Sequence, residues 1–334
     1  MTATPPAAVP DLVRFTTYNV LNLFEDDSAR QREHYKLVVE VIRELDPDVL
    51  AVQEILAPDQ RTAQSRLRRL ADDVGLRCLV PARPAARPAT TRAAARGAAS
   101  RPALAPGAHG YHVGLMWRDG ITPVPGSLRC YGEGYFWHSL AVVSLEAGGS
   151  VLRYAAHHAA PFGRLARAAD NERLVGLLAV KALAPPVIVG ADWNTESADR
   201  VRDPDTGAWT LYEPADPFAG TEWFDQLVHQ CTWEYGETGA RRHRADRLPG
   251  EVLWAGGLYD AAAVLRAPWQ ATTGHYAGDP FGERGIRRRI DGFRVSRDLI
   301  PALRSHQVTD SELARRASDH LPVTVEFLPR GLAG

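Results

Sequence analysis

Apolar positions along this chain follow helix spacing in some segments and form short buried runs in others. From Val38 to Leu45 they recur three and four positions apart, which is typical of one helix face, and Asp46-Pro47 ends that helix. A second helix is predicted over Leu165–Leu183, before Pro185-Pro186. The runs typical of buried strands are Leu12–Tyr18, Asp48–Val52, Val151–Ala156, Val187–Gly190 and the segment leading to Phe293–Val295. This alternation predicts an α/β fold rather than an all-α or all-β one.

Polar residues follow or end each predicted strand. Carboxylates, carboxamides and imidazoles at several strand ends can project into one place, where they would suit a hard divalent cation and a phosphate. The residues are Asn19, Gln53-Glu54, His157-His158, Asp192-Trp193-Asn194, Arg289-Ile290-Asp291 and Ser318-Asp319-His320. Each motif alone is common in proteins, and coincidence is a poor account of all six. We therefore predict one site built from all of these segments.

Oxygen-bearing side chains in this set suit metal and phosphate chemistry. Asp192 and Asn194 are two residues apart at a strand end, so their side chains leave the same face. A carboxylate there can orient or deprotonate a water, and an amide can donate to a phosphate oxygen. Glu54 is a natural ligand for Mg²⁺ or Mn²⁺, and Asn19 and Asp319 can complete the shell, directly or through water.

The histidines and arginines of the set suit roles in proton transfer and phosphate binding. His320 can donate to phosphoryl oxygens as charge builds in the transition state, and Asp291 is placed to orient a histidine. Arg289, or one of the two arginines before it, can offer a forked donor to a phosphate. His157 and His158 alternate in direction, so only one of them can face the site.

Composition and charge narrow the setting of this chemistry. The chain has 334 residues, 45% of them hydrophobic and 24% charged, which is ordinary for a globular protein. No apolar run approaches the roughly 20 residues that span a bilayer. Residues 1–10 are predicted to be flexible and resemble no signal peptide; with three dispersed cysteines, this favours a cytoplasmic protein. We expect a monomer with a single domain over residues 11–330.

Two segments differ from the rest of that domain in composition. Residues 82–109 are rich in Ala, Arg and Pro and contain no carboxylate, which predicts a flexible surface loop. That loop is either a basic arm for nucleic acid or, as we favour, a product of compositional bias. A Trp-rich irregular insertion is predicted over residues 199–250, with a basic cluster at Arg241–Arg244 where substrate selection can reside. The net charge of −1 favours a small phosphate ester or a locally basic groove.

The ordered motifs resemble the endonuclease/exonuclease/phosphatase superfamily, which has the deoxyribonuclease-I-like fold. The matching segments run from about residue 12 to 327, nearly the whole chain, and as an ordered set they are highly specific. They are Thr17-Tyr18-Asn19-Val20, Gln53-Glu54, His158-Ala159-Ala160-Pro161, Gly190–Asn194, Thr272–His275, Arg289-Ile290-Asp291 and Ser318–Val323. The resemblance implies a four-layer α/β sandwich with two central mixed β-sheets flanked by helices.

The same resemblance implies metal-dependent phosphoester hydrolysis by in-line attack of water. Glu54 would hold the metal with Asn19, Asp319 and Asp291 nearby. Asp192 would align the nucleophile. His158 would serve the leaving group. The residues that would contact the scissile phosphate are Asn194 and His320.

The chain departs from the abasic-site nucleases of that superfamily. They have an Asp where this chain has Leu21 and a Tyr near the position of His158, so the deoxyribonuclease, sphingomyelinase or phosphatase members are favoured. Nuclease and small-molecule phosphatase both stay open. The alternatives are a metal site used for non-phosphate chemistry and a non-catalytic binding protein. His112, His138 and His275 are interpreted as structural, with His138 a candidate for the flank of the pocket.

Overall fold

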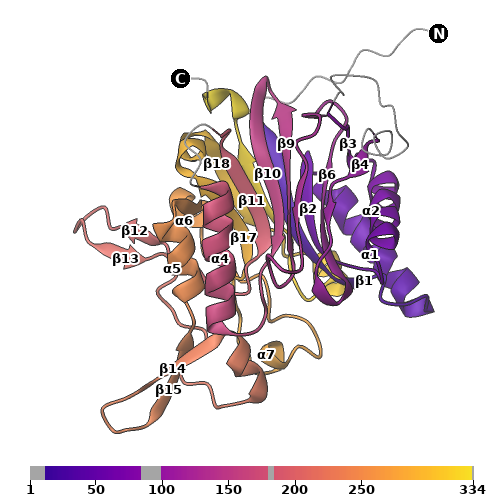
Figure 1. The fold of residues 1–334 in the computed structure, drawn as a ribbon. Coiled ribbons are helices and arrows are strands. Elements are labelled where there is room, and N and C mark those ends of the chain that lie inside the picture. Colours follow the sequence, from indigo (N-terminus) through magenta and orange to yellow (C-terminus); the bar gives the residue numbers. More distant parts are fainter. Residues whose placement is uncertain (1–11, 84–98, 180–183, 333–334) are drawn as a thin grey trace, which may run out of the picture.

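Two β-sheets pack face to face, with helices on both outer sides (Figure 1). This is a computed structural model, which describes residues 12–83, 99–179 and 184–332. The predicted four-layer α/β sandwich is confirmed. The expected flexible segment 1–10 lies outside the described residues. None of the described helices is both long and apolar enough to cross a bilayer.

The first sheet is built around a long central strand, β1. β1 runs parallel to β2, with Asn19 opposite Gln53, and antiparallel to β19. The strand order is β18-β19-β1-β2-β6-β5, and helices α1 and α2 cover the outer face (Figure 1). The bounds are β1 Val13–Leu23, β2 Val49–Leu56, β5 Leu104–Ala105, β6 Tyr111–Trp117, β18 Leu303–Val308, β19 Val323–Phe327, α1 Ala29–Leu45, α2 Gln60–Val74 and α8 Glu312–Ala317.

The second sheet contains a parallel pair, β10 and β11, beside an antiparallel strand, β17. Its order is β16-β17-β11-β10-β9-β7, with β8 paired to β9, and helices α4, α5 and α6 lie outside it (Figure 1). The bounds are β7 Thr122–Pro123, β8 Arg129–Tyr131, β9 Ser139–Ala147, β10 Ser150–His158, β11 Val187–Asp192, β16 Leu258–Asp260, β17 Asp291–Ser296, α4 Arg164–Leu178, α5 Leu248–Ala255 and α6 Ala261–Leu265.

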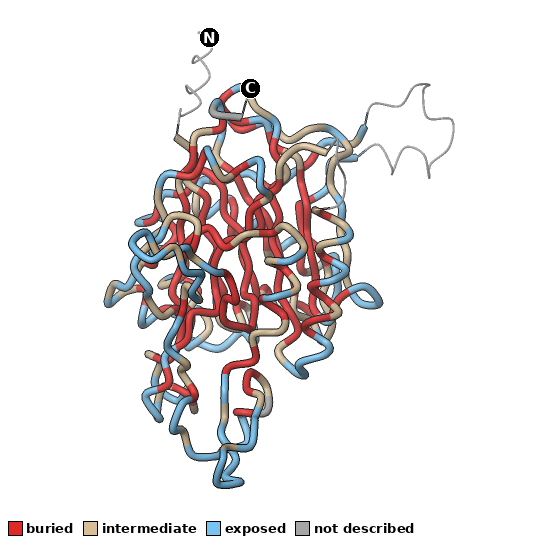
Figure 2. Tube along the Cα trace, turned by 90° about the vertical axis from the view of Figure 1, so that its left-hand side faces the viewer, coloured by how far each residue is buried: buried red, intermediate tan, exposed pale blue. Residues whose placement is uncertain are grey.

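Large side chains from both sheets fill the space between them, and the central strands are buried along most of their length (Figure 2). The ring of Phe15 lies 5.4 Å from that of Tyr154 and 5.0 Å from that of Phe293. Gly190 of β11 faces the other sheet, and a Cβ there would lie 2.9 Å from both Thr17 and Phe293. The missing side chain at Gly190 therefore lets the sheets approach closely just before Asp192.

Several elements extend beyond, or differ from, the segments predicted from the sequence. The predicted strands continue through the polar residues, so β10 includes both histidines and β11 includes Asp192. Within the 82–109 segment, residues 84–98 lie outside the described part. Residues 101–105 form β4 (Arg101–Pro102) and β5, and Ala103–Ala105 are buried rather than part of a surface loop. β4 pairs with β3 (Leu79–Val80).

The Trp-rich segment 199–250 is more regular than the sequence suggested. It forms two β-hairpins, and the second projects from the end of the sandwich that lies lowest in Figure 1. A short helix, α7, lies close to the base of that hairpin in the same view. The elements are β12 Arg200–Arg202, β13 Trp209–Leu211, η2 Asp225–His229, β14 Cys231–Tyr235, β15 Arg241–Ala245 and α7 Pro280–Glu283. The remaining short helices are η1 Ala108–Gly110, η3 Arg297–Ala302 and η4 Pro329–Leu332.

Candidate active site

Strand register in the second sheet places three of the predicted residues side by side. His158 at the end of β10 is opposite Asp192 at the end of β11, which is opposite Asp291 at the start of β17. His158 Nε2 lies 3.3 Å from Asp192 Oδ2. All three side chains are buried. The backbone register of the three strands therefore sets the spacing of these three residues.

Asn19 connects the two sheets at this end of the sandwich. Its Nδ2 donates to Glu54 Oε1 at 3.0 Å and to Asp192 Oδ2 at 3.1 Å. Its Oδ1 accepts from the backbone N–H of Leu21, which fixes which end of the amide faces the carboxylates. Asn19 therefore orients two carboxylates, and the ligand role expected from the sequence stays a prediction, since its Oδ1 keeps a second lone pair.

His320 is held between two carboxylates. Its Nδ1 donates to Asp291 Oδ2 at 2.8 Å, and its Nε2 lies 3.9 Å from Asp192 Oδ2. Ser318 secures this loop, because its hydroxyl donates to the Asn19 carbonyl at 2.8 Å and accepts from the His320 backbone N–H at 3.1 Å. Residues from both sheets thus determine where the imidazole lies.

The charges of this cluster are interdependent. Burial opposes a charge on His320, but Asp291, Asp192 and Asp319 raise its pKa well above the usual value. Burial likewise opposes the charge of Asp192, yet His320 and the bonds from His158 and Asn194 hold its pKa below the usual range. At neutral pH the centre therefore contains a protonated His320 next to an ionised Asp192.

A second histidine lies against His158. The ring of His138 stacks on that of His158, with centroids 3.9 Å apart and planes 13° from parallel. Burial, reinforced by His158, holds the pKa of His138 far below the usual value, so that ring is neutral. The adjacent His157 points elsewhere, and its Nδ1 contacts the Ser139 carbonyl at 2.9 Å. His157 thus has a structural position, and His158 belongs to the site.

Asn194 adopts a left-handed backbone conformation, with φ of 50°. Its N–H donates to Asp192 Oδ1 at 2.9 Å, its side-chain Nδ2 donates to the Ala159 carbonyl at 3.2 Å, and its Oδ1 accepts from Gln230 Nε2 at 3.0 Å. Glu54 also has a positive φ, of 66°. Non-glycine residues in this region persist only where surrounding contacts hold them, often at functional sites.

Glu54 and Asp319 have the character expected of residues that hold a hard cation. Burial, with Glu54 and Asp279 nearby, raises the pKa of Asp319 to about 6 against the opposing charge of His320. The buried Tyr18 hydroxyl finds no hydrogen-bond partner among the described residues, and Asp319 is among the causes of its raised pKa. An excess of carboxylates near an unpaired hydroxyl fits a hydrated divalent ion. A pocket of about 740 Å³ is lined in part by Asn22 and Asp319.

A different trio also comes close enough to share one ion. Ligand atoms of Asp192, Asp291 and His320 all lie within 4.8 Å of one another. However, Nδ1 of His320 is already bonded to Asp291, and the raised pKa of His320 leaves it protonated on both nitrogens. A protonated imidazole has no lone pair to offer a metal. Glu54 and Asp319 are therefore the better candidates.

The expectation that Arg289 binds substrate does not fit its position. Its guanidinium is buried and forms ion pairs with Glu213 and Asp260. Those contacts occupy the forked donor that a phosphate would need. Arg288 instead lies nearer the site, bonded to Gln230 Oε1, and Asp192 and Asp319 are among the charges acting on it.

Two residues of the site were given no role from the sequence, or a structural one. Gln230 joins Arg288 to Asn194, and no motif surrounds it. His138 was interpreted as structural, and the only sequence signal was its place beside Trp137. Both come from segments outside the six motifs; the sequence already offered His138 as a candidate for the flank of the pocket, and the folded chain alone reveals Gln230.

Comparison with known proteins identifies the fold and the family. A family model described as the Endonuclease/Exonuclease/phosphatase family matches residues 16–320. The chain belongs to this family. Members of the endonuclease/exonuclease/phosphatase family are hydrolases that act on phosphoester bonds. No curated protein matches the sequence significantly.

Solved structures share the fold at low sequence identity. An AP endonuclease from Archaeoglobus fulgidus is 16% identical with a TM-score of 0.55, and the match covers 94% of this chain and 99% of that one. A mannosyl-6-phosphatase from Bacteroides thetaiotaomicron is 15% identical with a TM-score of 0.53, covering 94% and 98%. A family protein from Bacteroides vulgatus is 13% identical with a TM-score of 0.58, covering 94% and 98%.

We predict that Arg289→Ala lowers the free energy of unfolding by on the order of 3–5 kcal/mol, because it leaves Glu213 and Asp260 buried without their partner. Urea denaturation measures this. The triple variant Arg289→Met, Glu213→Gln, Asp260→Asn should recover most of the loss. A stable Arg289→Ala protein with a raised KM would instead restore Arg289 as a substrate-binding residue.

Glu196 should make stability depend on pH. It is buried with both oxygens unpartnered among the described residues, and burial, reinforced by Glu213, raises its pKa to about 7. Between about pH 4.5 and 7 the unfolded chain ionises while the folded one keeps the proton, so folding stability falls as pH rises.

The free energy of unfolding of Glu196→Gln, relative to that of the wild type, should therefore rise from pH 5 to pH 8 by on the order of 1–3 kcal/mol. Urea unfolding at both pH values measures the gain. The exposed control Glu172→Gln on α4 should show no such difference. Equal effects of the two substitutions at both pH values would contradict a raised pKa for Glu196.

Proposed function

We propose that this protein is a divalent-metal-dependent phosphoester hydrolase in which water attacks phosphorus in line with the leaving group. The observation that carries the proposal is the environment of Asp192. That ionised carboxylate contacts His158 and Asn19 and lies 3.9 Å from the protonated His320. Such a set can orient a water on one side of a phosphate and stabilise charge on its oxygens.

Glu54 and Asp319 would hold the metal, Mg²⁺ or Mn²⁺. The ion would supply positive charge to the phosphoryl oxygens as negative charge develops in the transition state. Asn19 keeps Glu54 and Asp192 in fixed relation, since the same Nδ2 contacts both. Asn19 thereby fixes the position of the carboxylate proposed to hold the metal relative to the carboxylate proposed to orient the water.

Asp192 is assigned to the attacking water. Its lowered pKa keeps it ionised, so at neutral pH it accepts a hydrogen bond from water and sets the direction of attack. His158 is assigned to the leaving group, with the stacked His138 limiting its movement. Nδ1 of His158 is buried and has no partner among the described residues. The ring thus has one nitrogen at Asp192 and one available for a proton transfer.

His320 and Asn194 are assigned to the scissile phosphate. His320 carries a positive charge, and its hydrogen bond to Asp291 orients the imidazole ring. The side-chain amide of Asn194 has two N–H groups, and the Ala159 carbonyl accepts only one of them. The second N–H can therefore reach a phosphoryl oxygen. The activities in the names of the Archaeoglobus and Bacteroides relatives are in keeping with a phosphoester substrate.

Asp192→Asn and His320→Ala should each lower kcat by at least about 10²-fold, as losses of a water-orienting carboxylate and a transition-state donor do. Steady-state hydrolysis of a generic phosphodiester with Mg²⁺ measures the effect, with circular dichroism as the check on folding. Near-normal turnover in either folded variant would remove the role assigned to that residue.

Glu54→Ala should abolish metal-dependent hydrolysis and weaken Mn²⁺ binding, because it removes the carboxylate proposed to hold the ion. A panel of plasmid DNA, single-stranded oligonucleotides, a phosphodiester, nucleotides and sugar phosphates, each with Mg²⁺, Mn²⁺ or EDTA, tests the reaction. We expect cleavage of one class that EDTA stops. If no member is cleaved while calorimetry still detects Mn²⁺ binding, the proposed reaction is wrong.

A further inference from the structure

The β14–β15 hairpin presents two faces of different chemistry. Residues directly opposite each other in an antiparallel pair share a face, so Trp233 lies beside His243 and Tyr235 beside Arg241. Glu234 lies on the other face and forms an ion pair with Arg244, with atoms 2.6 Å apart. The first face therefore combines aromatic rings with the guanidinium of Arg241 and has no carboxylate from either strand.

Aromatic rings on this face are exposed and interleaved with an arginine. Trp233 is 48% exposed, Tyr235 74% and Trp223, which packs against the hairpin, 47%. The guanidinium carbon of Arg241 lies 4.2 Å from the ring centre of Trp233 and 5.2 Å from that of Trp223. Stacking of this kind keeps a positive charge in place between two flat surfaces.

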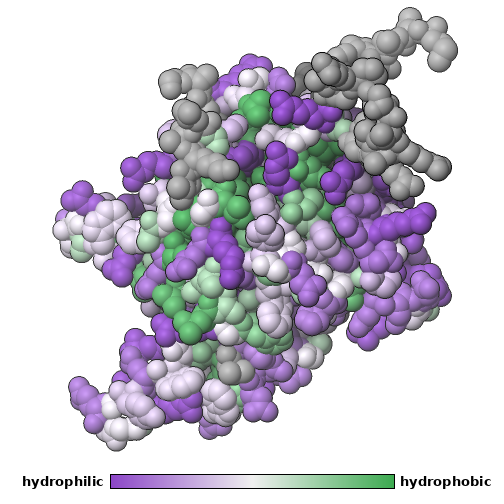
Figure 3. Space-filling model, viewed as in Figure 1, coloured by the Kyte–Doolittle hydropathy of each residue, from purple (hydrophilic) through white to green (hydrophobic). Residues whose placement is uncertain are grey.

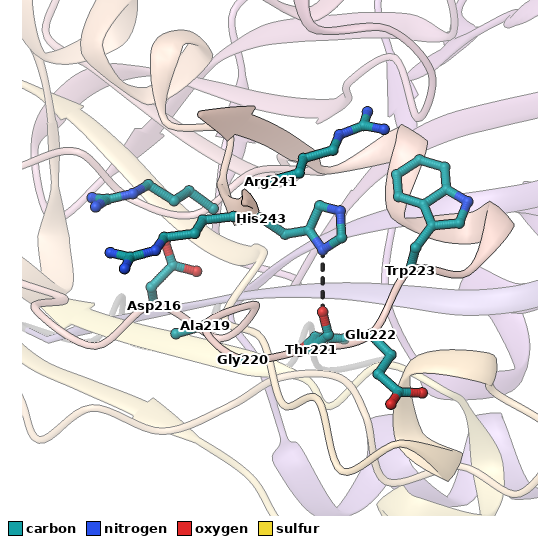
Figure 4. A pocket seen from close by; sticks show the side chains of 10 residues that line it. Asp216, Ala219, Gly220, Thr221, Glu222, Trp223, Arg241 and His243 are labelled. Atoms are coloured by element: carbon teal, nitrogen blue, oxygen red, sulfur yellow. Dashed lines mark hydrogen bonds between the residues drawn. The ribbon is translucent and has the colours of Figure 1, made fainter. Parts of the chain in front are cut away.

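Arg241 is free to meet an anion. It and Arg242 form no ion pair in the described ranges 12–83, 99–179 and 184–332. Both line a pocket of about 740 Å³ beside the hairpin. Figure 4 shows Arg241 extended above Trp223, with the carboxylate of Glu222 pointing away from both. Asp216 also lines this pocket, but its oxygens already accept from the backbone N–H of Ala245 at 3.1 and 3.0 Å.

The base of the hairpin is fastened to the candidate active site. Gln230, immediately before β14, donates to Asn194 at 3.0 Å. Asp246, immediately after β15, accepts from Thr195 through its backbone carbonyl and pairs with Arg167 at 3.2 Å. The hairpin is therefore anchored beside Asn194, which the proposed function assigns to the scissile phosphate.

We propose that this face of the hairpin docks single-stranded nucleic acid, with bases stacked on Trp233, Tyr235 and Trp223 and a phosphate paired with Arg241. The proposal rests on the proposed function, because it names the substrate class of that same site. Proteins that bind single-stranded nucleic acid without sequence preference do so with exposed aromatic rings, on which bases stack, and with arginines that pair with phosphates. Each five-residue strand of the hairpin spans roughly 17 Å, enough for more than one nucleotide.

A membrane surface fits the hairpin less well. The turn between the strands is Gly236-Glu237-Thr238-Gly239-Ala240, which carries a carboxylate and no large apolar side chain. In the view of Figure 3 the tip of the projecting hairpin is purple to white, without a hydrophobic surface. A segment that enters a bilayer would need apolar residues at that tip.

Binding of a fluorescein-labelled 20-nucleotide oligothymidylate, followed by anisotropy in EDTA so that no cleavage occurs, tests the proposal. Trp233→Ala should raise the Kd at least about tenfold, because a stacking ring is lost. Trp209→Ala is the matched control, since Trp209 is 61% exposed on the other hairpin. It should leave the Kd within about twofold of the wild type, as surface changes away from a contact do. Equal Kd values for the two variants would overturn the proposal.

Arg241→Gln provides a second test that does not depend on the loss of a large ring. The logarithm of the oligonucleotide binding constant falls as the logarithm of the salt concentration rises. Arg241→Gln should make this negative slope shallower by about one, as removal of a phosphate contact does. An unchanged slope would overturn the assignment of Arg241. Vesicles of anionic phospholipid are the competing probe. If Trp233→Ala abolishes vesicle binding and leaves oligonucleotide binding intact, the face binds membrane and the proposal is wrong.

Turnover of a small phosphodiester separates this proposal from the proposed function. Trp233→Ala should hydrolyse bis(4-nitrophenyl) phosphate at the wild-type rate while it loses affinity for the oligonucleotide. If the wild type hydrolyses no phosphoester yet binds the oligonucleotide through Trp233, the hairpin docks nucleic acid and the hydrolytic function fails. If hydrolysis occurs and Trp233→Ala changes no oligonucleotide affinity, the docking proposal fails alone.

Discussion

The hydrogen bonds from Asn19 to Glu54 and Asp192 are the contacts on which the candidate site depends most. The bond to Glu54 lies within the first sheet and the bond to Asp192 crosses to the second, so both carboxylates meet the same amide nitrogen. Buried carboxylates repel one another and lose hydration, so they stay together only where donors and cations compensate. Asn19 supplies a donor, and the protonated His320 supplies a charge. A divalent ion at Glu54 and Asp319 would supply the remainder.

The sandwich gives this cluster its precision. Gly190, two residues before Asp192, allows the sheets to approach closely. The register of β10, β11 and β17 places His158, Asp192 and Asp291 in a row. The 199–250 segment then adds Gln230, which orients Asn194. Two sheets with one close approach, the loop of residues 318–320 and one inserted segment together assemble the site.

Much of the fold could be predicted from the sequence because buried strands of this kind are continuous apolar runs. The strand ends also revealed most of the polar residues, since those residues interrupt the apolar pattern. Contacts between distant segments could not be predicted in this way. Arg289 was expected to bind phosphate because its charge is visible in the sequence. Its partners, Glu213 and Asp260, lie 76 and 29 residues away and have no motif of their own.

Other misjudged segments have similar causes. Ala103–Ala105 belong to a segment that is poor in large apolar residues, yet Leu104 and its two small neighbours are buried where β5 pairs with β6. The residue type of Asn19 suggests a metal ligand, but only the folded chain shows that its amide nitrogen meets Glu54 and Asp192. The cytoplasmic location and the monomeric state stay predictions.

Isotope incorporation tests the central claim most directly. Hydrolysis of a phosphodiester with Mg²⁺ in water enriched in ¹⁸O, with both products analysed by mass spectrometry, shows which atom the water attacks. The account predicts one ¹⁸O in the phosphate-containing product and none in the released alcohol, because water attacks phosphorus. Label in the alcohol, or label in neither product, would contradict in-line attack of water at phosphorus.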